Sequence, residues 1–356
     1  MNDQSTSPAV KPAQRKLMRR FVLVDGIAVL FLALVAAVVL AIDALLLLFA
    51  CVLFAVLLYE LSAILCRRFG WNRKLALVVV VLGLLLVIGL GGWAMAPQIA
   101  EQSTELAKQI PQSLQRLREM VESRPLLARI AAELPDAKQL IQSMQQFVPN
   151  AGIFFGGVLG AIGNVAIILF VGIYFALSPR QYKRGIVKLV PQDKRERAVQ
   201  VLDDIGDTLA RWLIGKSLSM LIVGVATAGG LTLLGVPLGL ILGIIAGLLD
   251  FIPYIGPIMA GVPAVLIALS ISPDLALYTV LLFLGIQTLE GYVLQPLVEA
   301  RAVEIPPALT IVMQLVFGSL FGFAGIALAT PLTAMLMVLI DKLYVEDILG
   351  DRPTGE

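Results

Sequence analysis

Hydrophobic residues dominate this chain in blocks long enough to cross a lipid bilayer, and short polar stretches separate them. The first block covers residues 21–65, and Asp43 interrupts it near its middle. A membrane-spanning helix needs about 20 apolar residues, so this block predicts two helices joined by a tight turn near Asp43. Basic residues flank both ends of the block, which by the positive-inside rule places both ends in the cytoplasm. A third helix, over residues 75–95, then crosses outward.

The longest polar stretch, residues 97–150, contains equal numbers of acidic and basic side chains, which suits a segment outside the cytoplasm. Apolar residues recur in it at helical spacing, at Leu106, Ile110, Leu114, Leu117 and Val121. We therefore expect two or three amphipathic helices that lie on the membrane or on neighbouring subunits. Residues 151–177 return across the membrane. Residues 178–212 are basic and amphipathic, so we expect a cytoplasmic, interfacial helix that leads into the next span.

The stretch Gly235–Pro263 is apolar enough to sit in lipid, yet it is unsuited to one regular helix. Its glycines recur at every fourth residue, at Gly235, Gly239, Gly243 and Gly247. This spacing makes a smooth helix face that another helix can approach closely, and the similarly spaced Gly152, Gly156 and Gly160 mark the expected partner. Helix-breaking residues follow Asp250, namely Pro253, Gly256 and Pro257.

Residues 236–249 would extend only about 21 Å as a helix, which is short for a hydrocarbon core of about 30 Å. They therefore predict a half-helix or a re-entrant segment. Unwound backbone at membrane depth is tolerated where it is buried in protein or lines a watery cavity, which favours a broken helix on a transport path over a kinked helix that only packs. Glycines also break the block 308–340, at Gly318, Gly322 and Gly325, with Pro331 near its end. We expect two short helices there, and paired broken segments indicate a binding site between them.

These patterns divide the chain into seven parts: a cytoplasmic tail (1–20), a transmembrane hairpin with a third span (21–96), an extracytoplasmic amphipathic segment (97–150), a transmembrane helix (151–177), a cytoplasmic basic segment (178–212), a C-terminal transport core (213–340) and an acidic cytoplasmic tail without regular structure (341–356).

Composition changes this picture little. Hydrophobic residues make up 59% and charged residues 15% of the 356 residues, and the mean hydropathy is +0.92, whereas a soluble protein carries about 25% charged residues. The predicted fold class is therefore all-α: a polytopic integral membrane protein with about eight transmembrane helices and broken or re-entrant segments in its C-terminal half. Histidine is absent, which excludes histidine metal sites and catalysis by Ser-His or Cys-His pairs. With only Cys51 and Cys66, we expect no disulfide framework.

Three strings in the C-terminal half resemble the signature motifs of the autoinducer-2 exporter (AI-2E) family, also called PerM-like permeases. They are DFIPYIGPIMAGVPA (250–264), IQTLEGYVLQPLVEARAVEIPPAL (286–309) and GSLFGFAGIALATPL (318–332). The resemblance extends over nearly the whole chain. It implies a secondary transporter in the bacterial cytoplasmic (inner) membrane. Members of this family are linked to export of the quorum-sensing signal autoinducer-2, and others to sodium or lithium exchange for protons.

Asp250 and Glu290 are the candidate transport and coupling residues, because ionisable residues inside a membrane are costly and usually functional. In apolar surroundings a carboxyl group keeps its proton more readily than in water, so either residue could exchange a proton near neutral pH. The alternative is that each caps a broken helix. Three amides could line a path for a polar solute or form interhelical hydrogen bonds instead: Gln287, Gln295 and Gln314. Besides the glycines and prolines named above, we assign Pro296 to the helix-breaking positions.

The string Gly-Lys-Ser at Gly215–Ser217 is not a phosphate-binding loop, because the required earlier glycine is Ala210 here and no strand precedes it. We therefore expect no ATP binding, no cofactor, no metal site and no nucleic-acid partner.

The expected partners are the lipid bilayer, a small polar solute, a proton or sodium ion, and further copies of the chain in a homo-oligomer. Three functions stay open: an exporter of a small polar solute, a sodium/proton antiporter, and a non-transporting scaffold. An enzyme is disfavoured, because no convincing nucleophile–base pair is present.

Overall fold

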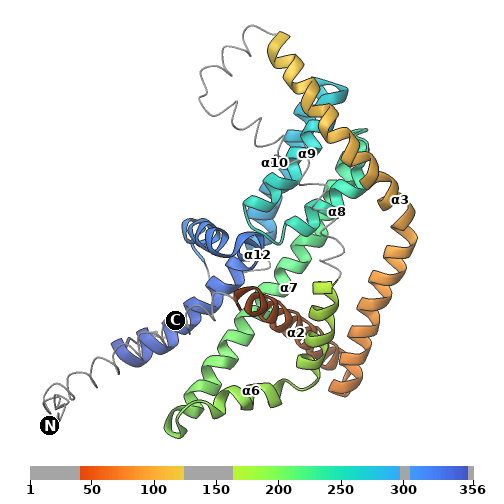
Figure 1. The fold of residues 1–356 in the computed structure, drawn as a ribbon. Coiled ribbons are helices and arrows are strands. Elements are labelled where there is room, and N and C mark those ends of the chain that lie inside the picture. Colours follow the sequence, from red (N-terminus) through yellow and green to blue (C-terminus); the bar gives the residue numbers. More distant parts are fainter. Residues whose placement is uncertain (1–40, 124–162, 297–304, 352–356) are drawn as a thin grey trace, which may run out of the picture. The chain divides into compact units, whose positions relative to one another are not determined.

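The computed structural model describes residues 41–123, 163–296 and 305–351. Within these ranges the chain consists of helices and short turns and contains no strand, which confirms the all-α class. The chain divides into two compact units, Met1–Leu46 and Leu47–Glu356. Figure 1 shows the elements in chain order: α2 (Ile42–Phe69), α3 (Arg73–Ser123), α6 (Pro179–Lys188), η1 (Gln192–Lys194), α7 (Arg195–Leu233), α8 (Gly239–Leu249), α9 (Ile255–Ile271), α10 (Pro273–Leu289), η2 (Glu290–Leu294), α12 (Pro307–Ile340) and η3 (Asp341–Leu349).

Five helices in the described ranges are long and apolar enough to cross a membrane, or six if the bent pair Gly163–Leu177 and Pro179–Lys188 forms one span. The polytopic membrane architecture is thereby confirmed. The short apolar helices α8 and α9 come in addition and make up the predicted broken segment. The first helix of the predicted N-terminal hairpin lies outside the described residues. Its second helix, α2, begins at Ile42 with Asp43 in the first turn.

Helix α3 continues well beyond the third span that we predicted over residues 75–95. It extends over 51 residues and includes Pro97 and Pro111. Leu106 of α3 is buried, and Ile99 and Ile110 pack against the same core cluster, which is formed mainly by α8 and α9. The first part of the predicted amphipathic segment therefore packs on the chain's own core through Leu106 and Ile110. Residues 124–150 lie outside the described residues.

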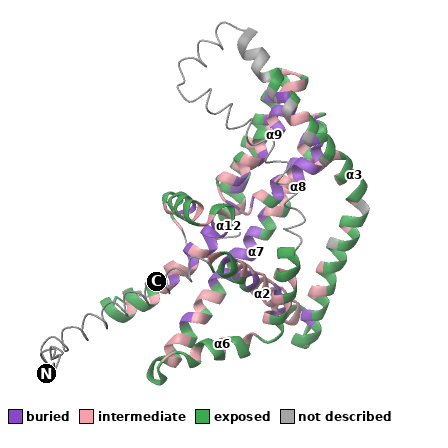
Figure 2. Cartoon of the chain, in the orientation of Figure 1, coloured by how far each residue is buried: buried purple, intermediate pink, exposed green. Residues whose placement is uncertain are grey.

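Helix α7 is the central support of the C-terminal core: it packs against α8 and α12, and Figure 2 shows buried residues along it. It contains 39 residues, so the amphipathic segment and the following span form one helix. A glycine C-cap ends it: Gly235 has φ 77°, and the amides of Gly235 and Val236 donate to the carbonyls of Thr232 and Leu231. Gly235 therefore terminates α7 and does not belong to the glycine face of α8.

The glycine face of α8 packs closely against α7. A Cβ on Gly243 would lie 2.4 Å from Ala228 Cβ, and one on Gly247 would lie 2.7 Å from the Met220 carbonyl oxygen. Gly224 of α7 approaches the same two α8 glycines. Glycine spacing predicts that another helix approaches closely, but it does not say which helix. Here α7, which directly precedes α8 along the chain, packs against it. Gly152, Gly156 and Gly160 lie outside the described residues.

Helix α12 is broken at Gly322, whose φ of 63° and ψ of −148° are not helical. Two helical halves meet there, so the predicted pair of short helices is present. The expectation of an unstructured tail after residue 341 is wrong as far as Leu349, because α12 continues directly into the π-helical segment η3. The reason is a charge network with α7. Arg197 Nη2 lies 2.7 Å from Glu346 Oε2 and 2.9 Å from Asp347 Oδ1, and it donates to the Lys342 carbonyl oxygen at 2.8 Å.

Substituting Arg197 with alanine is expected to loosen η3 without unfolding the membrane core. Exposed ion pairs contribute up to about 1 kcal/mol, so amide hydrogen exchange across 341–349 should accelerate about fivefold. Hydrogen exchange measured by mass spectrometry on the detergent-solubilised protein reports this directly. Arg211→Ala removes an exposed arginine from the same helix and serves as the control. Unchanged exchange in 341–349 would show that this network does not hold η3.

Candidate functional site

The backbone between α8 and α9 unwinds at residues 250–254 and forms a strained turn. Tyr254 has φ 63° and ψ −53°, and the Ile255 amide donates to the Pro253 carbonyl oxygen at 2.7 Å. This geometry is a γ-turn of the rare, strained form, and a non-glycine residue held in such a conformation costs about 1–3 kcal/mol. Strain of this kind persists only where the surrounding structure holds the turn in place.

Two contacts hold this turn. Gln314 Nε2 of α12 donates to the Pro253 carbonyl oxygen at 2.8 Å. On the other side, the ring of Phe251 meets the ring of Trp212 of α7 edge to face, with centroids 5.5 Å apart. The broken segment is therefore clamped between α7 and α12, the buried situation that unwound backbone requires at membrane depth.

Three charged side chains meet beside the break, in what we call the ion cluster: Lys216, Asp250 and Glu290. Lys216 Nζ lies 3.0 Å from Asp250 Oδ2 and 3.0 Å from Glu290 Oε1. All three residues are buried, with Asp250 only 1% exposed. Ser219 Oγ donates to the same Glu290 oxygen at 3.0 Å. The two carboxylates that the sequence singled out are thus brought together by one lysine.

Each member of the ion cluster is placed by a different element. Lys216 lies in α7 on the buried stripe that also contains Trp212, Ser219 and Val223. Asp250 is the residue at which α8 ends. Glu290 is the first residue of η2, where α10 widens into a π-helical turn. Such turns are rare and are frequent at functional sites.

The ion cluster is unbalanced in charge and in hydrogen bonding. One lysine faces two carboxylates, so the ionised cluster carries a net charge of −1. The Lys216–Asp250 contact is an ion pair without a well-formed hydrogen bond, and Asp250 Oδ1 has no hydrogen-bond partner within the described ranges. Gln314 Oε1, on the side chain that clamps the break, likewise has none there. Buried acceptors without partners are costly, so this place is suited to receiving a proton, a cation or a hydroxyl group.

The other predicted site residues lie in different surroundings. Gln314 is buried at the break, Gln287 is half-buried on α10, and Gln295 and Pro296 are exposed. Gly256 contacts the end of α8, Gly325 and Gly318 line the kink of α12, and Pro331 is buried behind it. In the part of the chain that the structure describes, no group of three or more acidic, cysteine or histidine side chains could hold a metal ion.

Lys216 is the member of the ion cluster that sequence reasoning missed. It stands in the Gly-Lys-Ser string that was considered only as a phosphate-binding loop, and it directly follows the basic segment. Its spacing was the available signal. Lys216 lies four residues after Trp212 and seven before Val223, so it shares the apolar face of α7.

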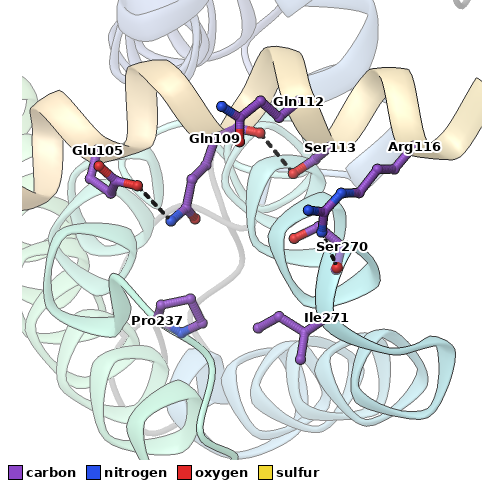
Figure 3. A pocket seen from close by; sticks show the side chains of 8 residues that line it. All are labelled: Glu105, Gln109, Gln112, Ser113, Arg116, Pro237, Ser270 and Ile271. Carbon is purple, nitrogen blue, oxygen red and sulfur yellow. Dashed lines mark hydrogen bonds between the residues drawn. The ribbon is translucent and has the colours of Figure 1, made fainter.

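A polar cavity of about 230 Å³ lies where α3 passes the start of α8 and the end of α9. Figure 3 shows the α3 side chains Glu105, Gln109 and Arg116 on one side and Pro237 and Ile271 opposite. Arg116 Nη1 donates to the Ser270 carbonyl oxygen at 2.5 Å, and Gln109 Nε2 donates to Glu105 Oε1 at 3.0 Å. The cavity thus presents a carboxylate, amides and a guanidinium group, a set that suits a small hydroxyl-rich molecule.

Comparison with known proteins gives one family. The model of the AI-2E family transporters matches residues 27–344. YrrI of Bacillus subtilis (strain 168) is 30% identical over 288 residues, which cover 76% of this chain and 78% of YrrI. YueF of the same organism is 26% identical over 276 residues, 74% of this chain and 75% of YueF. PerM of Escherichia coli (strain K12) is 25% identical over 295 residues, 79% of this chain and 81% of PerM. Their names provisionally describe YrrI and YueF as transport proteins and PerM as a permease.

Proposed function

The chain belongs to the AI-2E family of transporters, and from that premise we propose that it is a secondary transporter that exports a small polar solute and couples export to a proton or cation through Lys216, Asp250 and Glu290. The observation that carries the proposal is the buried ion cluster beside the strained break. A transporter family is not a class of enzyme, and we infer no catalytic role for these residues. By the distribution of basic residues, we place both termini in the cytoplasm.

The charge of the ion cluster supports coupling. A buried net charge of −1 is unfavourable, and a proton on one carboxyl group or a bound monovalent cation would make the cluster neutral. Lys216 lies at the same distance from both carboxylates, so it can compensate either of them while the other takes up the proton or cation. The cluster therefore has two states that differ by one positive charge, which is the requirement for an ion-coupled step.

Two buried oxygen atoms without hydrogen-bond partners in the described ranges support a polar cargo. Asp250 Oδ1 and Gln314 Oε1 flank the same break and can each accept a hydrogen bond. The hydroxyl groups of a small polyol would satisfy them, and the polar cavity beside α3 offers a second place of the same chemistry. Autoinducer-2 is a candidate cargo of this kind through the family resemblance.

The second candidate function is a sodium (lithium)/proton antiporter of the same family. Asp250 Oδ1 is a carboxylate oxygen without a hydrogen-bond partner in the described ranges, and carboxylate oxygens are ligands for hard cations. In this case the cluster alone would be the transport site, with sodium and proton in alternation. A non-transporting scaffold, the third candidate, would use the cluster only as a structural contact.

Flux measurements with Glu290→Gln and Asp250→Asn test the coupling. Each substitution leaves Lys216 with one carboxylate, so the cluster becomes neutral and the protein should remain folded, while proton exchange at the site is lost. We expect pH-driven flux in proteoliposomes to fall to background for both variants, in a screen of metabolite and ion efflux with the gradient imposed in each direction. Sodium-dependent proton flux without solute efflux would assign the antiporter instead.

Asp274→Asn is the matched control, because Asp274 is an exposed acid in the first turn of the same helix, α10. Its flux should equal that of the unmodified protein. If Glu290→Gln and Asp250→Asn both retain full pH-driven flux, coupling through the ion cluster is excluded. If neither flux is present in the unmodified protein, the scaffold is favoured.

A further inference from the structure

A second, larger cavity lies where the turn between α2 and α3 meets the beginning of α6. Its volume is about 740 Å³, and five of its lining residues are cationic: Arg73, Lys74, Arg180, Arg184 and Lys188. None of the lining residues is acidic. We call it the basic cavity. The basic cavity contains no residue of the ion cluster, so what it binds can be argued without knowing what the protein transports.

The cations of the basic cavity are not neutralised by the protein. Within the described ranges, none of the five forms an ion pair with a carboxylate. The Arg73 guanidinium lies over the Tyr59 ring, 3.6 Å from its centroid, and the positive charge of Arg180 repels it. Lys183 lies in α6, as Arg180 does, but outside the cavity, and it forms an ion pair with Asp203. Like charges held together in this way favour an anionic ligand between them.

The chemistry of the lining favours a phosphate group among the anions. Arginine presents a planar fork of donors that matches phosphate oxygens, and lysine adds a compact charge. Ser178 and Pro179 also line the cavity, so the first turn of α6 contributes the partial positive charge of a helix N-terminus.

The setting of the basic cavity favours a phosphate that belongs to a lipid. Helix α6 leaves the apolar helix Gly163–Leu177 at 83°, as an interfacial helix does. Leu77, Ala176 and Leu177 contribute apolar side chains to the wall. The exposed side chains of Phe69 and Trp71 lie next to the α2–α3 turn. Aromatic side chains gather at the level of lipid headgroups. Basic pockets between spanning helices on the cytoplasmic side bind anionic headgroups.

We propose that the basic cavity binds the phosphate of an anionic phospholipid headgroup, held by Arg73, Arg180 and Arg184, with its acyl chains along the exposed apolar face of α3. That face continues from the cavity through Leu75, Val78 and Leu82, all of them exposed. The shared chemistry is a phosphate group, which a membrane lipid presents as a phosphodiester and inorganic phosphate presents as the free ion.

The test is lipid binding by the purified full-length protein, followed by native mass spectrometry during titration with phosphatidylglycerol, phosphatidylcholine or inorganic phosphate. A basic residue that lies against an anionic headgroup strengthens its binding about fivefold, so Arg180→Gln combined with Arg184→Gln should weaken phosphatidylglycerol binding about 25-fold. The control pair is Lys183→Gln with Lys194→Gln, two cations of the same region outside the cavity. It should change binding less than twofold.

Preferential binding of phosphatidylglycerol over phosphatidylcholine, lost in the cavity pair and kept in the control pair, supports the proposal. An equal loss in both pairs would indicate general surface attraction and would overturn it. So would inorganic phosphate that binds as tightly as the lipid and displaces it, because the free ion would then be the ligand. The variant Arg180→Lys with Arg184→Lys keeps the positive charge and should retain most of the lipid binding. If this variant loses as much binding as the glutamine pair while its elution volume in size-exclusion chromatography is unchanged, the electrostatic assignment is contradicted.

Discussion

Replacing Lys216 with methionine is expected to abolish transport and to lower the free energy of unfolding by about 3–5 kcal/mol. Lys216 is the only cation within salt-bridge distance of Asp250 and Glu290 among the described residues, and both carboxylates are buried. Without it, two negative charges face each other in an apolar core. Removing one partner of a buried ion pair costs more than the pair itself contributes, because the remaining charge has no compensation.

A triple variant separates the structural part of this effect from the functional part. Lys216→Met combined with Asp250→Asn and Glu290→Gln removes every charge of the ion cluster, so stability should return to near that of the unmodified protein, while transport stays absent. Thermal unfolding in detergent and flux in proteoliposomes measure the two properties on the same preparations. A single Lys216→Met variant that unfolds at the temperature of the unmodified protein would show that Lys216 does not compensate the two buried carboxylates.

Much of this site could be predicted from sequence because its signals are local. Asp250 and Glu290 stand out as carboxylates within apolar strings, and Pro253, Gly256 and Pro257 mark the break by their backbone requirements alone. These inferences need only the neighbours along the chain. The positive φ of Tyr254 carries no such signal, because the turn is held by distant elements, for example by the hydrogen bond from Gln314 to the Pro253 carbonyl oxygen.

The missed features all depend on which surfaces meet in space. A lysine after a basic cytoplasmic segment is ordinary by topology, and only the packing of α7 encloses Lys216 between α8 and η2. The glycine spacing of α8 predicted close approach, but chain order could not tell α7 from residues 151–177. The polar stretch that begins at residue 97 suggested an end to the third span. Helix α3 nevertheless continues through it to reach the core with Leu106.

Substituting Gly256 with alanine is expected to disrupt the break between α8 and α9 more than any other single methyl group. A Cβ at Gly256 would lie 1.8 Å from the carbonyl oxygen of Leu249 and 2.7 Å from its carbonyl carbon. Both are backbone atoms at the end of α8, so they cannot rotate away as a side chain would. Overpacking of this kind costs about 1–3 kcal/mol.

The displacement should reach the ion cluster, because Asp250 directly follows Leu249. We therefore expect Gly256→Ala to lower the unfolding temperature and also to remove ion-coupled flux, although no charge is altered. Gly261→Ala in the same helix is the matched control, since its Cβ would lie 3.4 Å from the Phe283 ring, an ordinary contact, and it should keep both properties. If Gly256→Ala behaves like Gly261→Ala in both measurements, the tight turn does not position Asp250. If it loses flux but keeps its unfolding temperature, the turn serves the transport cycle rather than the stability of the fold.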